Sequence, residues 1–297
     1  MFYFLSCSII WGLTWAAIKY QFNSADAGAA VFYRFLCSSL ILFAFVIVKK
    51  LPLRFKKIDH FYFAAQGLFM FCLNYNLTYW AEELAPSALV ALAFTALIYF
   101  NLFGGKIFLR LPINLQVLYG AAVSFLGMGF IAYNELAHQE LHSTSLIGFF
   151  ISLVATLSAS AGNLVSIKNR EKKIPIASNN AWGMLYGSLL TLSYCLISNR
   201  SLALHNIDQS FVWSFIYLSL FGTVLSFGAY LKLIETMGPS KAAFTSVVSP
   251  IIAVAASMVL ENLKLNTALV AGILFCILGN IIALTPNLAL KIKKYVY

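Results

Sequence analysis

The chain has 297 residues, of which 61% are hydrophobic and 10% are charged, and its formal net charge is +10. Soluble domains are about 45–50% apolar and about 25% charged, so this composition excludes an ordinary water-facing surface and favours a protein that lies in a lipid bilayer. The basic residues fall in short runs between apolar segments, which indicates membrane topology, and no nucleic-acid partner is expected.

Ten apolar segments are long enough to cross a bilayer as helices, because a spanning helix needs about 17–25 mostly apolar residues. In chain order they cover residues 2–19, 28–48, 60–81, 86–108, 114–133, 146–167, 179–198, 210–232, 241–260 and 267–286. Their apolar runs are continuous, whereas membrane β-strands alternate between apolar and polar residues. The sequence therefore predicts an all-α integral membrane protein with ten transmembrane helices.

The Lys and Arg residues between these spans predict the orientation. With the N-terminus inside, the inner loops hold Lys49, Lys50, Arg54, Lys56, Lys57, Lys106, Arg110, Lys168, Arg170, Lys172, Lys173, Lys232, Lys241, Lys291, Lys293 and Lys294. The outer loops hold only Lys19, Arg200 and Lys264. Cytoplasmic loops carry the basic excess, so we expect a multi-pass protein of the cell inner (cytoplasmic) membrane with both termini in the cytoplasm.

Two motifs recur at an offset of about 152 residues, which indicates a duplication. Glu82-Glu-Leu-Ala-Pro-Ser matches Glu235-Thr-Met-Gly-Pro-Ser, and the pair Gly120 and Gly127 matches Gly272 and Gly279. Five spans in each half would make the second half enter the membrane in the opposite sense. We therefore predict two inverted five-helix repeats, residues 1–142 and 143–297, an arrangement typical of secondary transporters. The alternative is that Pro-Ser and spaced Gly pairs are ordinary features of membrane helices.

A set of short motifs also resembles a known family. The set consists of Trp11-Gly12-Leu13-Thr14-Trp15, Tyr33-Arg34-Phe35, Phe221-Gly222-Thr223, Ser249-Pro250, Glu261, and Gly272 with Gly279. It is similar to the EamA-type transporters of the drug/metabolite transporter superfamily, over nearly the whole chain as two consecutive domains. The resemblance implies ten helices, export or exchange of small metabolites, and a central cavity lined by the first, third, fourth, sixth, eighth and ninth spans.

The first half departs from the family pattern in having no counterpart of Pro250 and Glu261. We expect Pro250 to bend or weaken the ninth span by removing one helical hydrogen bond, and to give the second half more flexibility. An incidental Pro, tolerated by its neighbours, is the alternative. Glu261 is expected to pack or to anchor a loop.

The candidate substrate-binding residues are polar and aromatic side chains on the spans that the resemblance assigns to the cavity. They are Trp11, Trp15, Asn74, Tyr75, Thr78, Tyr99, Asn163, Ser226 and Tyr230. An amide that faces lipid without a partner is costly, and an interfacial aromatic belt does not explain a Trp at mid-span. For each of these side chains, packing or hydrogen bonding between helices is the alternative role.

Ionisable groups inside the spans are rare, so each is a functional candidate. Arg34 is the deepest of them, and three roles are considered for it: to attract a substrate carboxylate, to extend to the outer interface, or to pair with Asp26. A structural role is favoured. Glu82, with its neighbour Glu83, is expected to be solvated at the outer end of the third span, with gating as the alternative.

Glu235 stands three residues after Lys232 near the inner end of the eighth span, where the two can pair locally. With Glu82 and Pro250, Glu235 completes the group of candidate gating residues.

The leading functional hypothesis is a secondary transporter that moves an amino acid or a similar amphipathic or zwitterionic solute by alternating access, as an exporter or exchanger. No nucleotide-binding loop or cofactor motif is present in the sequence. A receptor or scaffold is the alternative, and an intramembrane enzyme a weaker one. His138 and His142 lack further ligands for a metal, and the five Cys show no paired spacing. We expect no enzyme activity; a small-molecule substrate and the lipid bilayer are the expected partners, and a homodimer is left open.

Overall fold

The computed structural model describes residues 2–85, 87–137, 143–260 and 267–285. These residues form a bundle of helices, and the only β-type pairing among them is an isolated bridge between Ala25 and Leu204. The predicted all-helical fold is confirmed for this part of the chain. Glu261, His138 and His142, which the sequence singled out, lie outside the described residues.

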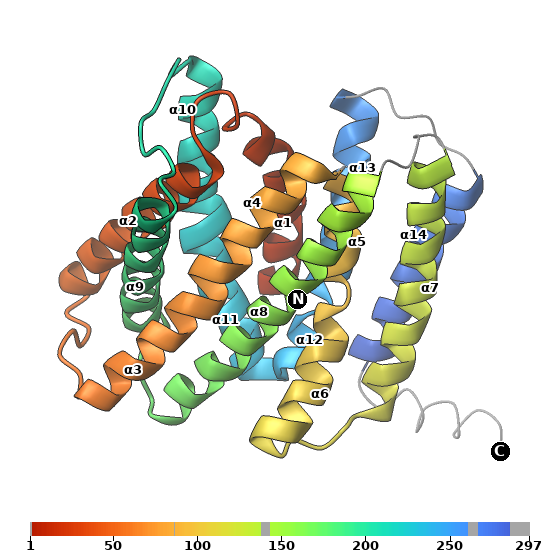
Figure 1. Cartoon of the computed structure of the whole chain (residues 1–297). Helices are drawn as coiled ribbons and strands as arrows, with labels where there is room; N and C mark the ends of the chain where they lie inside the picture. The colour runs from red at the N-terminus through yellow and green to blue at the C-terminus, as the bar shows by residue number, and fades with distance from the viewer. Residues whose placement is uncertain (1, 86, 138–142, 261–266, 286–297) are drawn as a thin grey trace.

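The first half of the chain contains α1 (Phe2–Lys19), α2 (Ala27–Val48), α3 (Lys57–Gln66), the π-helix η1 (Gly67–Leu73), α4 (Asn74–Leu84), α5 (Ser87–Phe94), α6 (Leu97–Leu109) and α7 (Leu115–Ala137). The second half contains α8 (Ser143–Glu171), α9 (Ile176–Ile197), α10 (Gln209–Ile216), the π-helix η2 (Tyr217–Leu225), α11 (Ser226–Met237), α12 (Pro239–Ala242), α13 (Thr245–Leu260) and α14 (Thr267–Leu284). α3, η1 and α4 follow one another without a gap and form one rod, as do α10, η2 and α11 (Figure 1).

Four helical segments of the described residues are long and apolar enough to cross a membrane: Phe2–Lys19, Ala27–Val48, Leu146–Glu171 and Gln209–Met237. Two of the predicted spans are each divided into two helices. The span predicted at 86–108 breaks between α5 and α6, and the span predicted at 241–260 breaks between α12 and α13. Tight i to i+3 hydrogen bonds mark both breaks, from Ile98 N to Thr95 O and from Ser246 N to Ala243 O.

The break in the ninth predicted span falls ahead of Pro250, and α13 continues through the proline. The break is therefore separate from Pro250, and the bending or weakening expected at Pro250 stays a prediction. Pro250 withholds one N–H from the carbonyl of Ser246, and a buried membrane helix tolerates such a loss where neighbouring groups compensate.

Each of the two long rods carries its π-helical turn in the middle. In η2, side chains favour the wider turn: Thr223 Oγ1 donates to Leu218 O at 2.7 Å, and Ser226 Oγ donates to Phe221 O at 2.8 Å, both five residues back. π-helical turns are rare and often occur at functional sites. Here one of them, η2, brings Thr223 to the centre of the bundle.

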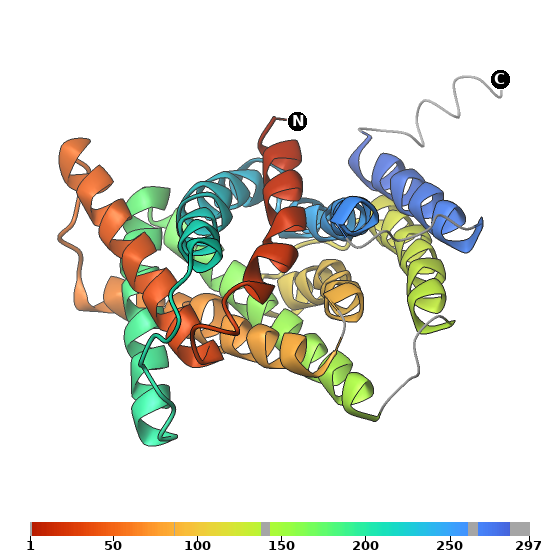
Figure 2. The ribbon, with the colours of Figure 1, turned by 90° about the horizontal axis from the view of Figure 1, so that it is seen from above.

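Glycines allow α7 and α14 to pack closely at one edge of the molecule (Figures 1 and 2). A Cβ added to Gly120 would lie 2.6 Å from the carbonyl oxygen of Gly279, and one added to Gly127 would lie 2.6 Å from that of Gly272. Only glycine permits this approach of two backbones. The glycines that repeat in the sequence thus contact each other in reverse order, Gly120 with Gly279 and Gly127 with Gly272. The two helices therefore run antiparallel.

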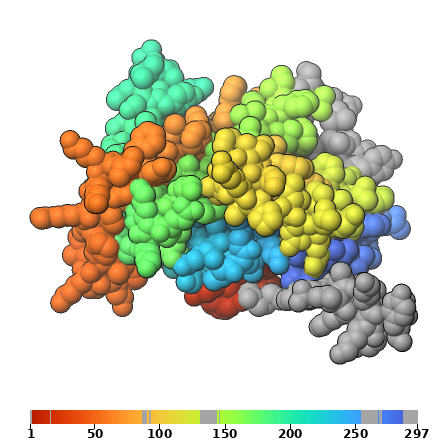
Figure 3. Space-filling model, turned by 90° about the horizontal axis from the view of Figure 1, so that it is seen from below, coloured from red at the N-terminus to blue at the C-terminus, as the bar shows by residue number. Residues whose placement is uncertain are grey.

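At the opposite edge α2 packs against α9, and Ser39 Oγ donates to Ala181 O at 2.8 Å between them. Between these two edges lie most of the other helices, among them α1, α4, α8 and α11 (Figure 1). Seen from below, the ends of α8 and α6 and the turn from α11 to α12 meet over this middle part (Figure 3). This covered end is the lower end of the bundle in Figure 1.

Candidate substrate cavity

A cavity of about 100 Å³ lies in the middle of the bundle. It is lined by Trp11, Thr14, Trp15 and Ile18 of α1, Arg34 of α2, Met70 of η1, Asn74, Tyr75 and Thr78 of α4, Ala91 and Phe94 of α5, Leu97 of α6, Ala159 and Asn163 of α8, Phe227 and Tyr230 of α11, and Ser246, Ser249 and Pro250 of α13. One buried water needs about 10–15 Å³, so this space suits a small solute. Both halves of the chain contribute to its wall.

The structure places most of the sequence-predicted residues at this cavity. Trp11, Trp15, Asn74, Tyr75, Thr78, Asn163, Tyr230 and Pro250 line it. Tyr99 and Ser226 do not: the Tyr99 ring packs against that of Phe125, and the Ser226 hydroxyl donates to the backbone of its own helix. Sequence assigned both to helices that reach the cavity, but they lie on other faces.

Aromatic rings make the apolar wall, and Trp11 is held at its centre. Its ring centroid lies 4.9 Å from that of Tyr230 and 5.4 Å from that of Phe227, and its indole N–H donates to Gly222 O at 3.1 Å. The Trp15 ring packs edge-on against Phe94. Such edge-on and tilted contacts are favourable and give the rings of the wall defined orientations.

Arg34 lines the cavity and is buried, with 1% of its surface exposed. Its Nε donates to Thr223 Oγ1 at 2.8 Å, its Nη1 to the Tyr79 hydroxyl at 3.4 Å, and its Cζ lies 4.8 Å from the Tyr75 ring centroid. The expected extension to the outer interface, or pairing with Asp26, is therefore wrong.

The physical reason is that Asp26 has other partners. Its side chain accepts the N–H of Gly28 as the N-cap of α2 and forms an ion pair with Arg200 at 3.5 Å. The Arg34 side chain instead points into the bundle, where Thr223 of η2 accepts its hydrogen bond.

Two buried polar atoms beside the cavity have no hydrogen-bond partner within the described part of the chain. They are the indole nitrogen of Trp15 and the side-chain oxygen of Asn74. The amide nitrogen of Asn74 donates to Met70 O at 3.3 Å, which leaves the oxygen as an acceptor. Buried polar atoms are normally paired, so these two suit a bound solute or water. Asn76, the other amide of this helix, instead donates to Thr191 of α9 at 3.0 Å.

A neutral polar cluster runs from the cavity wall to α12 at the lower end of the bundle. Asn163 Nδ2 donates to the Tyr230 hydroxyl at 3.1 Å and to Asn101 Oδ1 at 3.3 Å, and Asn101 Nδ2 donates to Pro239 O at 3.1 Å. These bonds join α8, α11, α6 and α12. Breaking them would leave buried polar groups unpaired, which costs about 1–3 kcal/mol for each group.

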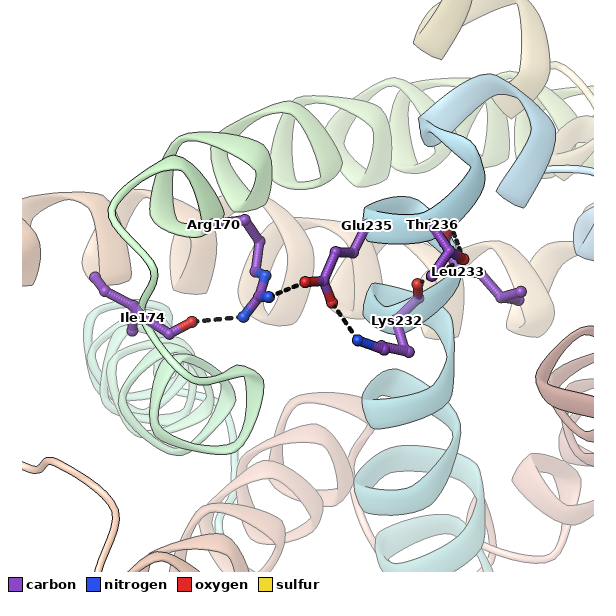
Figure 4. Close-up of polar contacts among 6 residues, drawn as sticks. All are labelled: Arg170, Ile174, Lys232, Leu233, Glu235 and Thr236. Carbon is purple, nitrogen blue, oxygen red and sulfur yellow. Dashed lines mark hydrogen bonds and ion pairs between the residues drawn. The ribbon is translucent and has the colours of Figure 1, made fainter.

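Two turns further along α8, an ionic cluster joins α8 to α11 (Figure 4). Arg170 and Lys232 both bind the Glu235 carboxylate, and Arg170 Nη1 also donates to Ile174 O at 2.8 Å. The predicted pairing of Lys232 with Glu235 is confirmed at 2.9 Å. We call these three charged residues the lower latch.

A second ion pair at the lower end joins α3 to the residue that follows α8. Lys172 Nζ lies 2.7 Å from Asp59 Oδ1. The hydrogen bond from Lys172 is the main cause that lowers the pKa of the Asp59 carboxyl. A lowered pKa means that this pair stabilises the fold above the unfolded-state value of about 3.9 and is lost only as the pH falls through the folded-state value.

Glu82 is buried, with 7% of its surface exposed, whereas Glu83 is exposed. The prediction that both are solvated is corrected for Glu82. The last turn of α4 packs against α8, where Ile151 packs against the apolar cluster that contains Ala81 and Ala85, so this end of the helix is covered.

Comparison with known proteins adds the family. Two stretches, residues 1–133 and 146–285, match the EamA-like transporter family. The chain belongs to this family.

Two relatives of this EamA-like transporter are named as a transporter and as an efflux pump, and their sequence identity to the chain is low. The chain is similar to "Uncharacterized transporter YoaV" of Bacillus subtilis (strain 168), with 24% identity over 251 residues and 84% of each chain covered. It is also similar to "Probable amino-acid metabolite efflux pump" of Salmonella typhimurium, with 23% identity over 279 residues, 91% of this chain and 90% of the relative. A crystal structure matches with a TM-score of 0.79 over 98% of both chains at 12% identity, which shows the fold alone. The family and these names indicate a membrane transporter and not an enzyme.

In this EamA-like transporter the structure adds site residues that sequence reasoning missed. Thr14, Phe227 and Ser249 line the cavity. Thr14 and Ser249 stand inside the motifs that carry the family resemblance, and that position was the available signal.

Proposed function

We propose that this EamA-like transporter is a secondary carrier that moves an amino acid, or a similar small zwitterionic solute, by alternating access. The observation that carries the proposal is one central cavity with aromatic walls and a few polar groups, lined by helices from both family-matched stretches. Solute sites of this kind are mostly apolar, with a small number of placed polar groups. The relative named as a probable amino-acid metabolite efflux pump supports an amino acid and export.

The proposal includes ten spans in two inverted five-helix repeats, residues 1–142 and 143–297. It counts α3–η1–α4, α5–α6, α10–η2–α11 and α12–α13 as one span each. The antiparallel contact of Gly120 with Gly279 and of Gly127 with Gly272 supports it, because an in-plane two-fold axis would relate these two pairs. So does the π-helical turn in the middle of each long rod.

We assign the lower end of the bundle, and both termini, to the cytoplasmic side. The basic residues Arg170, Lys172 and Lys232 all lie at that end, beside the latch and the Asp59 pair. Cytoplasmic ends of membrane proteins carry such an excess.

The gating proposal assigns Glu235 to the cytoplasmic gate. The lower latch and the Asn163 cluster must both open before the cavity can reach the cytoplasm. Pro250 at the cavity wall and the break between α12 and α13 are proposed to let α13 move, and buried Glu82 is proposed for the external gate.

The test is uptake of radiolabelled amino acids by liposomes that contain the purified protein. We expect saturable uptake of at least one amino acid, above that of protein-free liposomes. Folded protein that moves none of the twenty amino acids and no related amine or amide would contradict the carrier assignment.

A further inference from the structure

Arg34 is a buried cation, and its hydrogen bonds within the described residues all go to neutral oxygens. Only the bond from Nε to Thr223, at 2.8 Å, is short; those from the terminal nitrogens to Tyr79 and to Gly222 O are 3.4 and 3.5 Å long. A guanidinium has five N–H donors in a planar fork that matches a carboxylate. Its terminal nitrogens therefore retain the capacity to donate to an anion in the cavity.

The position of the guanidinium is fixed by its surroundings. The Tyr75 ring lies 4.8 Å from Cζ, and Thr223 holds Nε from the π-helical turn. Gly222 makes room for it, because a Cβ at that residue would lie 3.3 Å from Nη2. A cation held in this way inside a membrane protein is costly to keep and marks a functional site.

The same cavity offers one further acceptor and one further donor. The unpartnered oxygen of Asn74 can accept from an ammonium group, and the unpartnered indole N–H of Trp15 can donate to a carboxylate. Trp11 and Phe227 supply an apolar wall beside them. A solute with a carboxylate, an ammonium group and an apolar side chain would satisfy all of these groups together.

We infer that Arg34 binds the carboxylate of an α-amino acid, with the ammonium group at Asn74 and the side chain against the aromatic wall. The inference builds on the proposed carrier function and adds a requirement, namely that the substrate carry a carboxylate. A purely structural Arg34 would also tie α2 to η2 and α4. That role would affect the stability of the protein but would not distinguish a carboxylate from its amide.

The first experiment therefore varies the ligand and leaves the protein unchanged. The melting temperature of the purified wild-type protein is measured with L-leucine, L-leucinamide and isopentylamine, and with the other proteinogenic amino acids. We expect amino acids to raise the melting temperature, and leucinamide and isopentylamine to give no shift at equal concentration. An equal shift with leucinamide or isopentylamine, or a panel without any shift from a carboxylate, overturns the inference.

The second experiment changes the protein. Arg34→Gln should abolish the shift caused by the amino acid that binds the wild type, and Arg34→Lys should weaken its affinity about tenfold or more, because a lysine cannot form the bidentate pair. Arg200→Gln, which removes an exposed arginine paired with Asp26, is the matched control and should bind as the wild type does. A folded Arg34→Gln protein with wild-type affinity overturns the inference.

The two proposals fail in different ways. Liposomes that take up leucinamide or isopentylamine but no carboxylate would overturn the Arg34 site and leave the carrier function standing. Protein that binds amino acids through Arg34 but moves none across the membrane would overturn the carrier function and leave the site standing.

Discussion

Trp11 is a single residue whose place in the cavity wall could be predicted from the sequence. Its position at mid-span predicted a buried role, and the structure places it against Tyr230 and Phe227. The partner of Arg34 was beyond prediction, because Thr223 lies 189 residues away in the chain. Tyr99 and Ser226 were assigned to helices that reach the cavity, but sequence does not fix the rotation of a helix about its own axis against several neighbours.

Trp11 also gives the residue-scale prediction. Trp11→Ala should raise the KM for the amino acid that the wild type transports about tenfold, since an aromatic ring in the cavity wall supplies much of the apolar contact. Trp11→Phe, which keeps a ring but loses the hydrogen bond to Gly222 O, should raise it less. Trp213→Ala, at a side chain that is 63% exposed, is the control and should leave KM unchanged. A Trp11→Ala protein with wild-type KM would move the binding site elsewhere.

At the scale of elements, the helical runs followed from apolar length, but their interruptions did not. No Pro or Gly stands at Thr95–Ala96 or at Ala243–Phe244, where two predicted spans break. At the second break the hydroxyls of Thr245 and Ser246 donate to Ala242 O and Ala243 O, whereas Pro250, the breaker that the sequence offers, stays inside a helix. The repeated glycines were informative in another way, because their spacing placed them on one face of each helix.

Gly127 and Gly129 lie two residues apart on α7 and should respond to alanine in opposite ways. A Cβ at Gly127 would lie 2.6 Å from Gly272 O, whereas one at Gly129 meets nothing within 4 Å. Gly127→Ala should cost about 1–3 kcal/mol of stability through overpacking, and Gly129→Ala should add about 0.4–1 kcal/mol through the unfolded chain. Thermal unfolding in detergent measures both. Equal effects of the two changes would contradict the close contact of α7 with α14.

The lower latch gives the second prediction for elements. Glu235→Gln removes the carboxylate that joins Arg170 of α8 to α11, and each such exposed ion pair contributes about 0.2–1 kcal/mol. A cysteine introduced as Ser249→Cys, in a protein without the five native cysteines, reports access to the cavity. In the Glu235→Gln protein we expect this cysteine to react about two- to fivefold faster with a thiol reagent supplied from the lower end of the bundle. Glu171→Gln is the control, because its pair with Lys168 stays within one helix. An unchanged labelling rate in Glu235→Gln would show that the latch does not gate the cavity.

At the scale of the whole molecule, composition and the duplicated motifs carried most of the prediction. Low charge and long apolar runs predicted a membrane protein of helices, and the ordered motifs predicted the family that the comparisons confirm. The cavity itself depends on side chains from both family-matched stretches, which only the packed structure brings together. We propose that the two halves lie in the membrane in opposite orientations and expose this cavity to one side at a time.

A counterflow experiment tests alternating access most directly. Liposomes containing the protein are loaded with unlabelled substrate amino acid and diluted into a trace of the radiolabelled form. A carrier that exposes its cavity to one side at a time must accumulate label above the outside concentration for a time, and we predict that overshoot, with its loss in the Trp11→Ala protein. Label that only equilibrates, at a rate that rises linearly with concentration, would contradict alternating access.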